Sequence, residues 1–195
     1  MVKEILLGST NRHKYEELRE IFAAFSGKLL FGGDFQRLSV EETGSSYREN
    51  ALLKARAWSK ATSLPAVADD SGLEVEVLEG APGIYSARQG ENDEERLAWL
   101  LRMLEGQSHR KARFVACLAY CDISRREEFI AHGYCYGTIA EAPRGDLGFG
   151  YDPLFIPSGY RDTLGVLGER VKSKISHRIS ATRALLSILR EENVL

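Results

Sequence analysis

A short apolar run that ends in two adjacent carboxylates is the feature of this 195-residue chain that most limits its fold. Residues 64–68, Leu-Pro-Ala-Val-Ala, have the character of a buried strand, and Asp69 and Asp70 follow directly. Open α/β sheets bind their ligands at the carboxyl ends of such strands. We therefore expect the pair at the end of a strand, where Ser71 and Gly72 turn the chain. Because successive side chains of a strand point to opposite faces, only one carboxylate can enter a given site.

The pair allows two interpretations. In the functional one, a single aspartate binds a metal ion or accepts a proton, while the other orients the loop. In the structural one, residues 69–72 are only a solvated turn, in which an aspartate side chain accepts from the backbone. The other motifs of the chain are needed to decide between the two.

Composition and charge exclude several classes of protein. The 26 Lys and Arg residues nearly balance the 28 Asp and Glu residues, so the chain has no basic field to coat a nucleic-acid polymer. The apolar run near the amino terminus is too short for a signal peptide or a membrane span, which predicts a cytoplasmic protein without a membrane partner. We expect the three cysteines to be buried thiols: Cys117, Cys121 and Cys135. The alternative is a metal site that includes a cysteine and His132, but the spacing of these residues matches no familiar zinc pattern.

Strand-like and helix-like segments alternate along the chain. We expect strands at residues 2–8, 64–68, 73–78, 113–123, 129–139 and 154–156, with 113–123 and 129–139 as an antiparallel pair. Helices are expected at 13–22, after Ser45 and Ser46, from Asn92 to Gly106, and after Ser176. The expected apolar helix positions include Leu18, Ile21, Phe22 and Phe25, then Ala51, Leu52, Ala55 and Trp58. The pattern predicts a single α/β domain over residues 1–195, because no linker divides it.

Four further segments carry chemistry. Residues 9–14 combine hydroxyls, a helix start and a lysine, as a phosphate site does, although helix capping alone explains the first three. Glu41 and Glu42 add a second acidic pair, which together with an aspartate could hold Mg²⁺ or could be a solvated loop. Residues 148–153 set two aromatic rings among glycines, which suits stacking on a flat ligand or core packing. Residues 172–178 gather cations at a helix start, which suits an anion or the carbonyl edge of a base, or a solvated face.

Taken in order, seven motifs resemble the inosine triphosphate pyrophosphatase family over about residues 5–189. They are Ser-Thr-Asn-x-x-Lys, Glu-Glu-Thr-Gly, Tyr-x-Glu-Asn-Ala, Ala-Asp-Asp-Ser-Gly-Leu, Ala-Pro-Gly-Ile-Tyr-Ser-Ala-Arg, Gly-Phe-Gly-Tyr-Asp-Pro and Ile-Ser-His-Arg. The resemblance implies a Mg²⁺-dependent enzyme that cleaves the bond between the α and β phosphates of ITP, dITP and XTP. The products would be the monophosphate and pyrophosphate, so that deaminated purines are removed from the nucleotide pool.

The resemblance also implies the roles of individual residues. Asp70 would accept the proton of the attacking water and, with Glu41, would hold the metal; Ser71 would touch the substrate. The residues that would bind the triphosphate are Ser9, Thr10, Asn11, Arg12, His13 and Lys14. Those that would form the purine pocket are Phe149, Gly150, Tyr151, Asp152, Lys172, His177 and Arg178.

In architecture, the resemblance implies a long twisted mixed sheet flanked by helices, two lobes with a central cleft, and a homodimer. Three alternatives remain: a pyrophosphatase for other nucleotides such as modified pyrimidines, a nucleotide-binding regulator without turnover, and a purely structural domain. Asp146, Leu147 and Val171 depart from the family pattern near the proposed base pocket, which affects fine specificity more than the reaction.

Overall fold

The structure, a computed structural model, describes residues 4–23, 28–35 and 38–195. Within these residues the strands form one seven-stranded sheet in the order β2-β1-β3-β5-β6-β7, and β4 pairs with β3 beside this path. The strands are β1 (Glu4–Leu7), β2 (Lys28–Phe31), β3 (Ala66–Val75), β4 (Pro82–Gly83), β5 (Lys111–Asp122), β6 (Glu127–Ile139) and β7 (Phe155–Pro157). The α-helices are α1 (Arg12–Ala23), α2 (Tyr47–Thr62), α3 (Asp93–Met103), α4 (Leu164–Leu167), α5 (Glu169–Ile175) and α6 (His177–Glu191).

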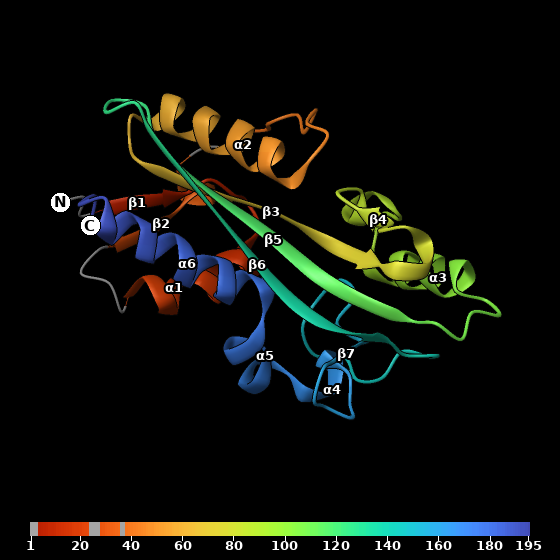
Figure 1. Cartoon of the computed structure of the whole chain (residues 1–195). Helices are drawn as coiled ribbons and strands as arrows, with labels where there is room; N and C mark the ends of the chain where they lie inside the picture. Colours follow the sequence, from red (N-terminus) through yellow and green to blue (C-terminus); the bar gives the residue numbers. More distant parts are fainter. Residues whose placement is uncertain (1–3, 24–27, 36–37) are drawn as a thin grey trace. The chain divides into compact units, whose positions relative to one another are not determined.

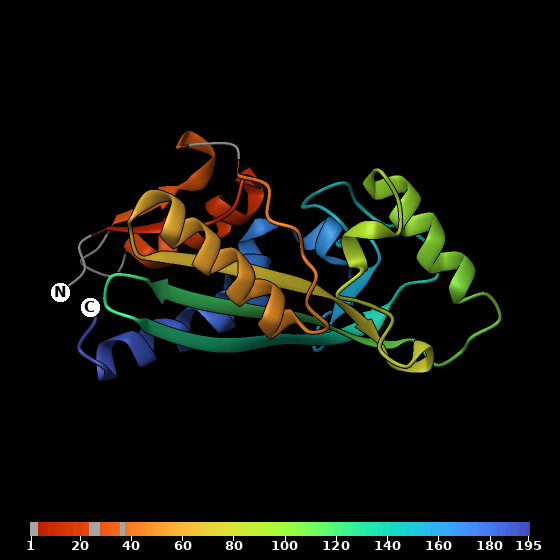
Figure 2. The ribbon, with the colours of Figure 1, turned by 90° about the horizontal axis from the view of Figure 1, so that it is seen from above.

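The sheet is mixed. Strand β1 pairs in parallel with both β2 and β3, whereas β7 runs antiparallel to β6. Strands β5 and β6, joined by a short turn, run in opposite directions as predicted (Figure 2). The predicted fold class, a long twisted mixed sheet flanked by helices, is confirmed.

The contacts divide the chain into two compact units, which we describe separately. Unit 1 comprises Met1–Asp70, Ala116–Gly133 and Arg178–Leu195, and unit 2 comprises Ser71–Val115 and Tyr134–His177. Strands β3, β5 and β6 contribute residues to both units. The single domain and the central cleft that the sequence suggested stay predictions.

In unit 1, helices cover both faces of the sheet (Figure 1). On one face α1 and α6 bury side chains such as Leu18 and Leu185 against Val67 and Leu118. On the other face α2 packs its predicted apolar positions: Ala51, Leu52 and Ala55 lie with Ala68, and Trp58 lies with Leu6. Because Val67 and Ala68 contact opposite helices, the alternation of β3 is directly visible in its packing.

In unit 2, Leu100 of the helix α3 and Leu104, the residue that follows this helix, pack in a core with Leu73, Phe114 and Phe155. The start of α3 follows the predicted capping pattern, since the Asn92 side chain accepts from the amide of Glu95 at 2.9 Å. The helix itself ends at Met103, three residues before the predicted glycine.

The predicted turn after the aspartate pair is wrong. Strand β3 continues without interruption from Ala66 to Val75, so the segment expected as a separate strand at 73–78 is its second half, followed by a 3-10 turn at Glu76–Leu78. The short strand β4 holds this second half by pairing with Leu73 and Glu74. Ser71 and Gly72 therefore lie inside one extended strand, between the part that pairs with β1 at Val67 and the part that pairs with β4 at Leu73.

Asp69 and Asp70 lie within β3, but they are just past the end of the neighbouring strand β1. The parallel pairing of β1 with β3 ends at Leu7 and Val67, just before Asp69.

Two expectations, the first residues of the 2–8 strand and the apolar role of Phe25, lie outside the described residues. No helix among the described residues is both long enough and apolar enough to cross a membrane.

Candidate active site

The first of two side-chain clusters is centred on Asp69 in unit 1. Its Oδ2 lies 2.7 Å from the Lys14 ammonium and accepts from the Arg178 guanidinium at 3.2 Å. The same guanidinium donates to Glu17 at 3.1 Å. Helices α1 and α6 thus bring two cations and a carboxylate to one residue of β3. Asp69 and Arg178 are both buried, so the four side chains form a compensated ionic core.

The charges of this cluster shift its titration. Burial by itself would raise the pKa of Asp69, but the positive charges of Lys14 and Arg178 outweigh it and hold the pKa well below the ordinary value. Burial also lowers the pKa of Lys14, which Asp69 offsets only in part. Burial would lower the pKa of Arg178 as well, but Glu17 and Asp69 keep it raised. Asp69 therefore stays ionised and cannot serve as a proton carrier near neutral pH.

Asp70 has different partners on the opposite face of β3. Its Oδ1 accepts from the Lys54 ammonium at 2.9 Å, and its Oδ2 accepts from the side-chain amide of Asn50 at 3.3 Å. The same lysine donates to Glu42 at 2.5 Å. Two carboxylates therefore share one ammonium, with the two donors supplied by α2.

This environment raises the pKa of Asp70. Burial is the main cause, and the Lys54 charge offsets it only in part, while Glu42 and Asp69 add to it. For Lys54, burial lowers the pKa, but Asp70 and Glu42 outweigh that effect and raise it. Asp70 is thus the member of the pair whose proton affinity is suited to acid–base chemistry.

Asn50 also contacts the loop at residues 41–44, which carries Glu41 and Glu42 and is called the acidic loop below. Its side-chain oxygen accepts from the amide of Gly44 at 2.8 Å, while its amide group reaches Asp70. The loop therefore places Glu42 against Lys54, whereas Glu41, the predicted metal ligand, is exposed. The role of Glu41 stays a prediction, and the structure adds Glu42 as the acidic residue in contact with the cluster.

Sequence reasoning missed Asn50, Lys54 and Glu17 as members of these clusters. A signal for the first two exists: they are polar residues four positions apart on a helix whose neighbouring positions are apolar, so they share a face. Glu17 gave no such signal, since it follows another glutamate on a helix with many charges.

The predicted phosphate-binding turn is built by capping. Asn11 accepts from the amide of Lys14 at 3.2 Å, and the Ser9 hydroxyl accepts from the amide of Asn11 at 3.1 Å. Thr10 and His13 are exposed, and Arg12 is paired with Glu16 and lies over the rings of Tyr15 and Phe31. The capping role that the sequence offered as the alternative is therefore present, and phosphate binding here stays a prediction.

The carboxylate oxygens near Asp70 in unit 1 are suitable ligands for Mg²⁺. Mg²⁺ takes hard oxygen ligands and needs only one or two carboxylates beside water and phosphate oxygens. Asp70 and Glu42 provide carboxylate oxygens at one place, and the shared ammonium of Lys54 shows that this place already attracts a cation. Among the described residues no group of three or more His, Cys, Asp or Glu side chains could enclose a metal by itself.

The second cluster is the loop at residues 148–152 in unit 2. Asp152 is buried, and its Oδ2 accepts from the amide of Phe149 at 2.9 Å and from the Lys172 ammonium at 2.6 Å. That ammonium lies 4.0 Å from the centre of the Phe149 ring. Gly148 has a φ of +81°, and a Cβ there would meet the Asp152 carboxylate at 2.2 Å, so only glycine allows this return of the chain.

The loop is also held from outside. The amide of Gly150 donates to Asp93 at 2.6 Å, and the Tyr151 hydroxyl donates to the carbonyl of Ser86 at 2.9 Å. Tyr151 is buried in the core of unit 2, so the core-packing alternative applies to it, whereas the Phe149 ring is partly exposed.

The remaining predicted residues take separate places. The His177 ring, which is buried, stacks on Phe114 with 4.9 Å between ring centroids and 15° between planes. Ser71 is partly buried on β3 next to Asp70. Of the departures from the family pattern, Leu147 is half exposed and Val171 is buried in α5.

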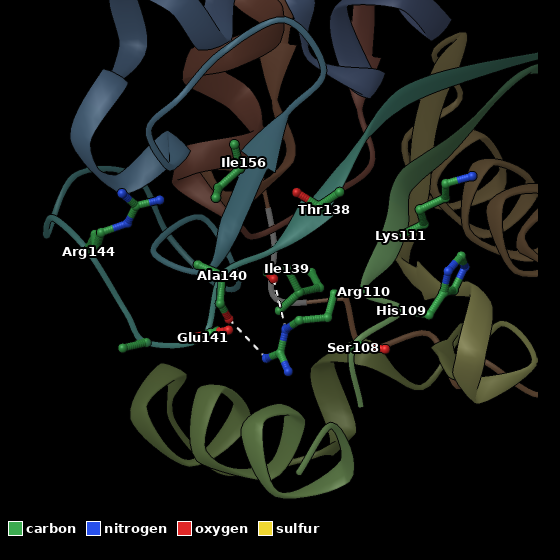
Figure 3. A pocket seen from close by; sticks show the side chains of 11 residues that line it. Ser108, His109, Arg110, Lys111, Thr138, Ile139, Ala140, Glu141, Arg144 and Ile156 are labelled. Carbon is green, nitrogen blue, oxygen red and sulfur yellow. Dashed lines mark hydrogen bonds between the residues drawn. The ribbon is translucent and has the colours of Figure 1, made fainter. Parts of the chain in front are cut away.

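A hollow of about 640 Å³ in unit 2 has a different lining (Figure 3). The guanidinium of Arg110 donates there to the carbonyls of Ile139 and Ala140, both at 3.0 Å. The side chains of Lys111 and Arg144 point in different directions and do not converge on a common point (Figure 3). This hollow therefore lacks the convergent polar groups of a ligand site.

A mixed sheet flanked by helices, with a buried carboxylate of raised pKa beside a second acidic residue and a lysine, is an arrangement typical of enzymes that carry out acid–base chemistry on charged ligands. The chain belongs to the Ham1 family, whose model matches residues 5–188. The resemblance drawn from the seven motifs is thereby confirmed.

The relatives agree over almost the whole chain. The dITP/XTP pyrophosphatase of Aquifex aeolicus is 41% identical, with 96% of each chain covered. The protein of the same name from a strain of Thermus thermophilus is 46% identical and covers 96% of this chain and 92% of its own. Among solved structures, a HAM1 protein from Coxiella burnetii matches with a TM-score of 0.88 and 39% identity, covering 97% of this chain and all of that one.

Proposed function

We propose that this protein hydrolyses the non-canonical purine nucleoside triphosphates dITP, XTP and ITP to their monophosphates and pyrophosphate. Its class as an enzyme, a nucleoside triphosphate diphosphatase, follows from relatives named dITP/XTP pyrophosphatase that match 96% of the chain. The observation that carries the mechanism is the setting of Asp70, a buried carboxylate with a raised pKa between Lys54 and Asn50.

In this mechanism Asp70 orients a water molecule and accepts its proton. The water oxygen attacks the α-phosphorus in line, and the bond from that phosphorus to the oxygen bridging to the β-phosphorus breaks. Pyrophosphate leaves with that bridging oxygen. No covalent intermediate with the protein is needed.

The lysines of unit 1 compensate the negative charge of the triphosphate. Lys14, at the start of α1, and Lys54, on α2, each already neutralise one aspartate of the pair. A bound triphosphate would share these ammonium groups with the carboxylates, and the helix start of α1 favours an anion. Arg178, which the resemblance assigned to the purine pocket, is buried in unit 1 between Glu17 and Asp69, and its proposed role is to hold Asp69 in place.

Mg²⁺ fits as the cofactor because its preferred ligands are present. Asp70 and Glu41 would hold the ion, and Glu42 would add an oxygen where Lys54 now donates. When bound, Mg²⁺ supplies neutralisation of the charge on the phosphate oxygens.

The loop at 148–152 is the proposed purine site. The partly exposed Phe149 ring offers a face for stacking, and Lys172 and His177 supply polar groups for the edge of the base. Hypoxanthine and xanthine carry a carbonyl at position 6, whereas adenine carries an amino donor there. A protein donor aimed at that position would be left unpaired by adenine, at a cost of about 1–3 kcal/mol.

Product identity tests the proposal. ITP, dITP, XTP, ATP and a modified pyrimidine triphosphate are each incubated with the protein and Mg²⁺, and the products are separated by anion-exchange chromatography. Monophosphate and pyrophosphate from the first three, with ATP nearly unchanged, are expected. Diphosphate and phosphate would contradict attack at the α-phosphorus, and the absence of any product would favour a nucleotide-binding protein without turnover.

The family resemblance also leads us to propose a homodimer. Light scattering coupled to size-exclusion chromatography measures the mass directly, and twice the 21.8 kDa of one chain is expected. A mass of one chain at micromolar concentration would contradict the dimer without affecting the proposed chemistry.

A further inference from the structure

The carboxylate of Asp93 links the start of α3 to the loop at 148–152. Its Oδ2 accepts from the amide of Gly150 at 2.6 Å, although the two residues lie 57 positions apart in the sequence. Its Oδ1 accepts from the Arg96 guanidinium at 2.5 Å. A hydrogen bond to a charged acceptor is stronger than one between neutral groups, so this contact is a firm attachment point for the loop.

Asp93 is itself oriented by its neighbour on the helix. Arg96 donates to the carbonyl of Ala87 at 3.2 Å as well as to Asp93, so its guanidinium has a fixed position. One carboxylate oxygen of Asp93 is thereby taken by the arginine, and the other is left directed to the Gly150 amide. The attachment point is ordered on both sides.

Two carboxylates therefore hold two successive amides of the loop. Asp152 accepts from the amide of Phe149, and Asp93 accepts from the amide of Gly150, where φ is +62°. These two amides flank the Cα of Phe149, which carries the aromatic ring. Removal of either acceptor would leave the backbone at Phe149 fixed on one side only.

We propose that Asp93 is a positioning residue that holds the Phe149 ring in the orientation for stacking on the purine. This inference rests on the proposed function, because it assigns the stacking surface of the same site. Asp93 touches neither the substrate nor the reacting atoms in this role; it acts through the backbone of the loop. Its loss should weaken substrate binding and leave the chemical step intact.

The test compares three variants with the wild-type protein. Asp93→Ala removes the acceptor, Asp93→Asn keeps a neutral acceptor oxygen, and Glu94→Ala is the matched control, since Glu94 is an exposed acidic residue in the same helical turn. For ITP, Asp93→Ala should raise KM about tenfold with kcat within about twofold. Asp93→Asn should recover most of the affinity, and Glu94→Ala should match the wild type.

A second readout follows the loop without any substrate. Amide hydrogen exchange of the peptide covering residues 148–154 should be about tenfold faster in Asp93→Ala than in Glu94→Ala, because the Gly150 amide loses its acceptor. Should Asp93→Ala not fold, Arg96→Ala gives the same comparison, since it leaves Asp93 in place but unoriented; faster exchange and a higher KM are again expected.

Two outcomes would overturn the inference. One is an unchanged KM and unchanged exchange in Asp93→Ala, and the other is a loss of kcat as large as the rise in KM. A wild-type protein that hydrolyses none of the purine triphosphates would instead remove the proposed function, and the exchange experiment would still show whether Asp93 holds the loop.

Discussion

Asp69 and Asp70 are adjacent in the sequence, but their carboxylates are paired with different lysines on opposite faces of β3. Asp69 lies 2.7 Å from Lys14, and Asp70 lies 2.9 Å from Lys54. Burial raises the pKa of both carboxyl groups. For Asp70 burial outweighs the charge of Lys54 and the pKa stays raised, whereas for Asp69 the charges of Lys14 and Arg178 together outweigh burial and the pKa is lowered. Asp69 is therefore held as an ion within the structure, and Asp70 is the one that we propose as the proton acceptor.

Replacement of Asp70 tests its role as proton acceptor. Asp70→Asn keeps the shape and the hydrogen-bonding capacity of the side chain but removes its basicity, so kcat for dITP should fall about 10²–10⁴-fold. The melting temperature should change little, because burial already disfavours the charged form. Initial rates and calorimetric unfolding are measured on the same preparation, and wild-type kcat in this variant would remove Asp70 from the mechanism.

Replacement of Asp69 should have the opposite outcome. Asp69→Asn leaves Lys14 and the buried Arg178 without their shared carboxylate, which should lower the free energy of unfolding by about 3–5 kcal/mol. Urea unfolding at neutral pH measures this loss. A variant as stable as Asp70→Asn would show that the ionic cluster around Asp69 contributes little to the fold.

Much of the fold could be predicted because its signals are local. The apolar spacing of α2 and the Asn92–Glu95 capping pattern depend on residues a few positions apart, and both elements form as expected. The turn at Ser71 and Gly72 was predicted wrongly because β3 is paired on both sides of these residues, with β1 at Val67 and with β4 at Leu73. Apolar spacing does not reveal these contacts, and they overrule the local signal for a turn.

The candidate site was predictable to the extent that its residues lie in recognisable motifs. Asp70, Phe149 and Lys172 come from such motifs, and the structure gives each of them a polar or aromatic partner. Lys54 contacts Asp70, which is 16 positions further along the chain, and Asp93 contacts Gly150, which is 57 positions further. Only the folded chain brings such pairs together, so sequence spacing could not assign them.

Removal of the Phe149 ring tests stacking. Phe149→Ala should raise KM for ITP about tenfold, since stacking of a base on an aromatic side chain contributes about 1–3 kcal/mol. Phe149→Trp, which keeps an aromatic face, is the matched variant and should stay close to the wild type. Equal KM values in the alanine variant and the wild type would leave the ring a packing role only.

The two glutamates of the acidic loop can be separated by substitution. Glu41 is exposed and is proposed to hold Mg²⁺ together with Asp70, whereas Glu42 is already paired with Lys54 and would only add a further oxygen. Glu41→Gln should therefore raise the Mg²⁺ concentration for half-maximal activity about tenfold or more, and Glu42→Gln should change it less. Titration of activity with Mg²⁺ at saturating dITP measures both, and the reverse order would assign the metal to Glu42.

The titration of Asp70 should respond to Mg²⁺. In the metal-free protein its pKa is raised above that of an ordinary aspartic acid, mainly by burial, so it takes up a proton at a higher pH than usual as the solution is acidified. A bound cation favours the carboxylate form, so Mg²⁺ should lower this pKa and binding at mildly acid pH should release a proton. Because both metal binding and proton acceptance need the ionised form, activity should fall as pH drops through the pKa of the complex.

Carbon NMR of the labelled carboxyl groups follows Asp70 with and without Mg²⁺. Asp69, whose pKa is held low by Lys14 and Arg178, is the internal control. An Asp70 pKa that does not change with Mg²⁺ would exclude this carboxylate as a ligand of the metal.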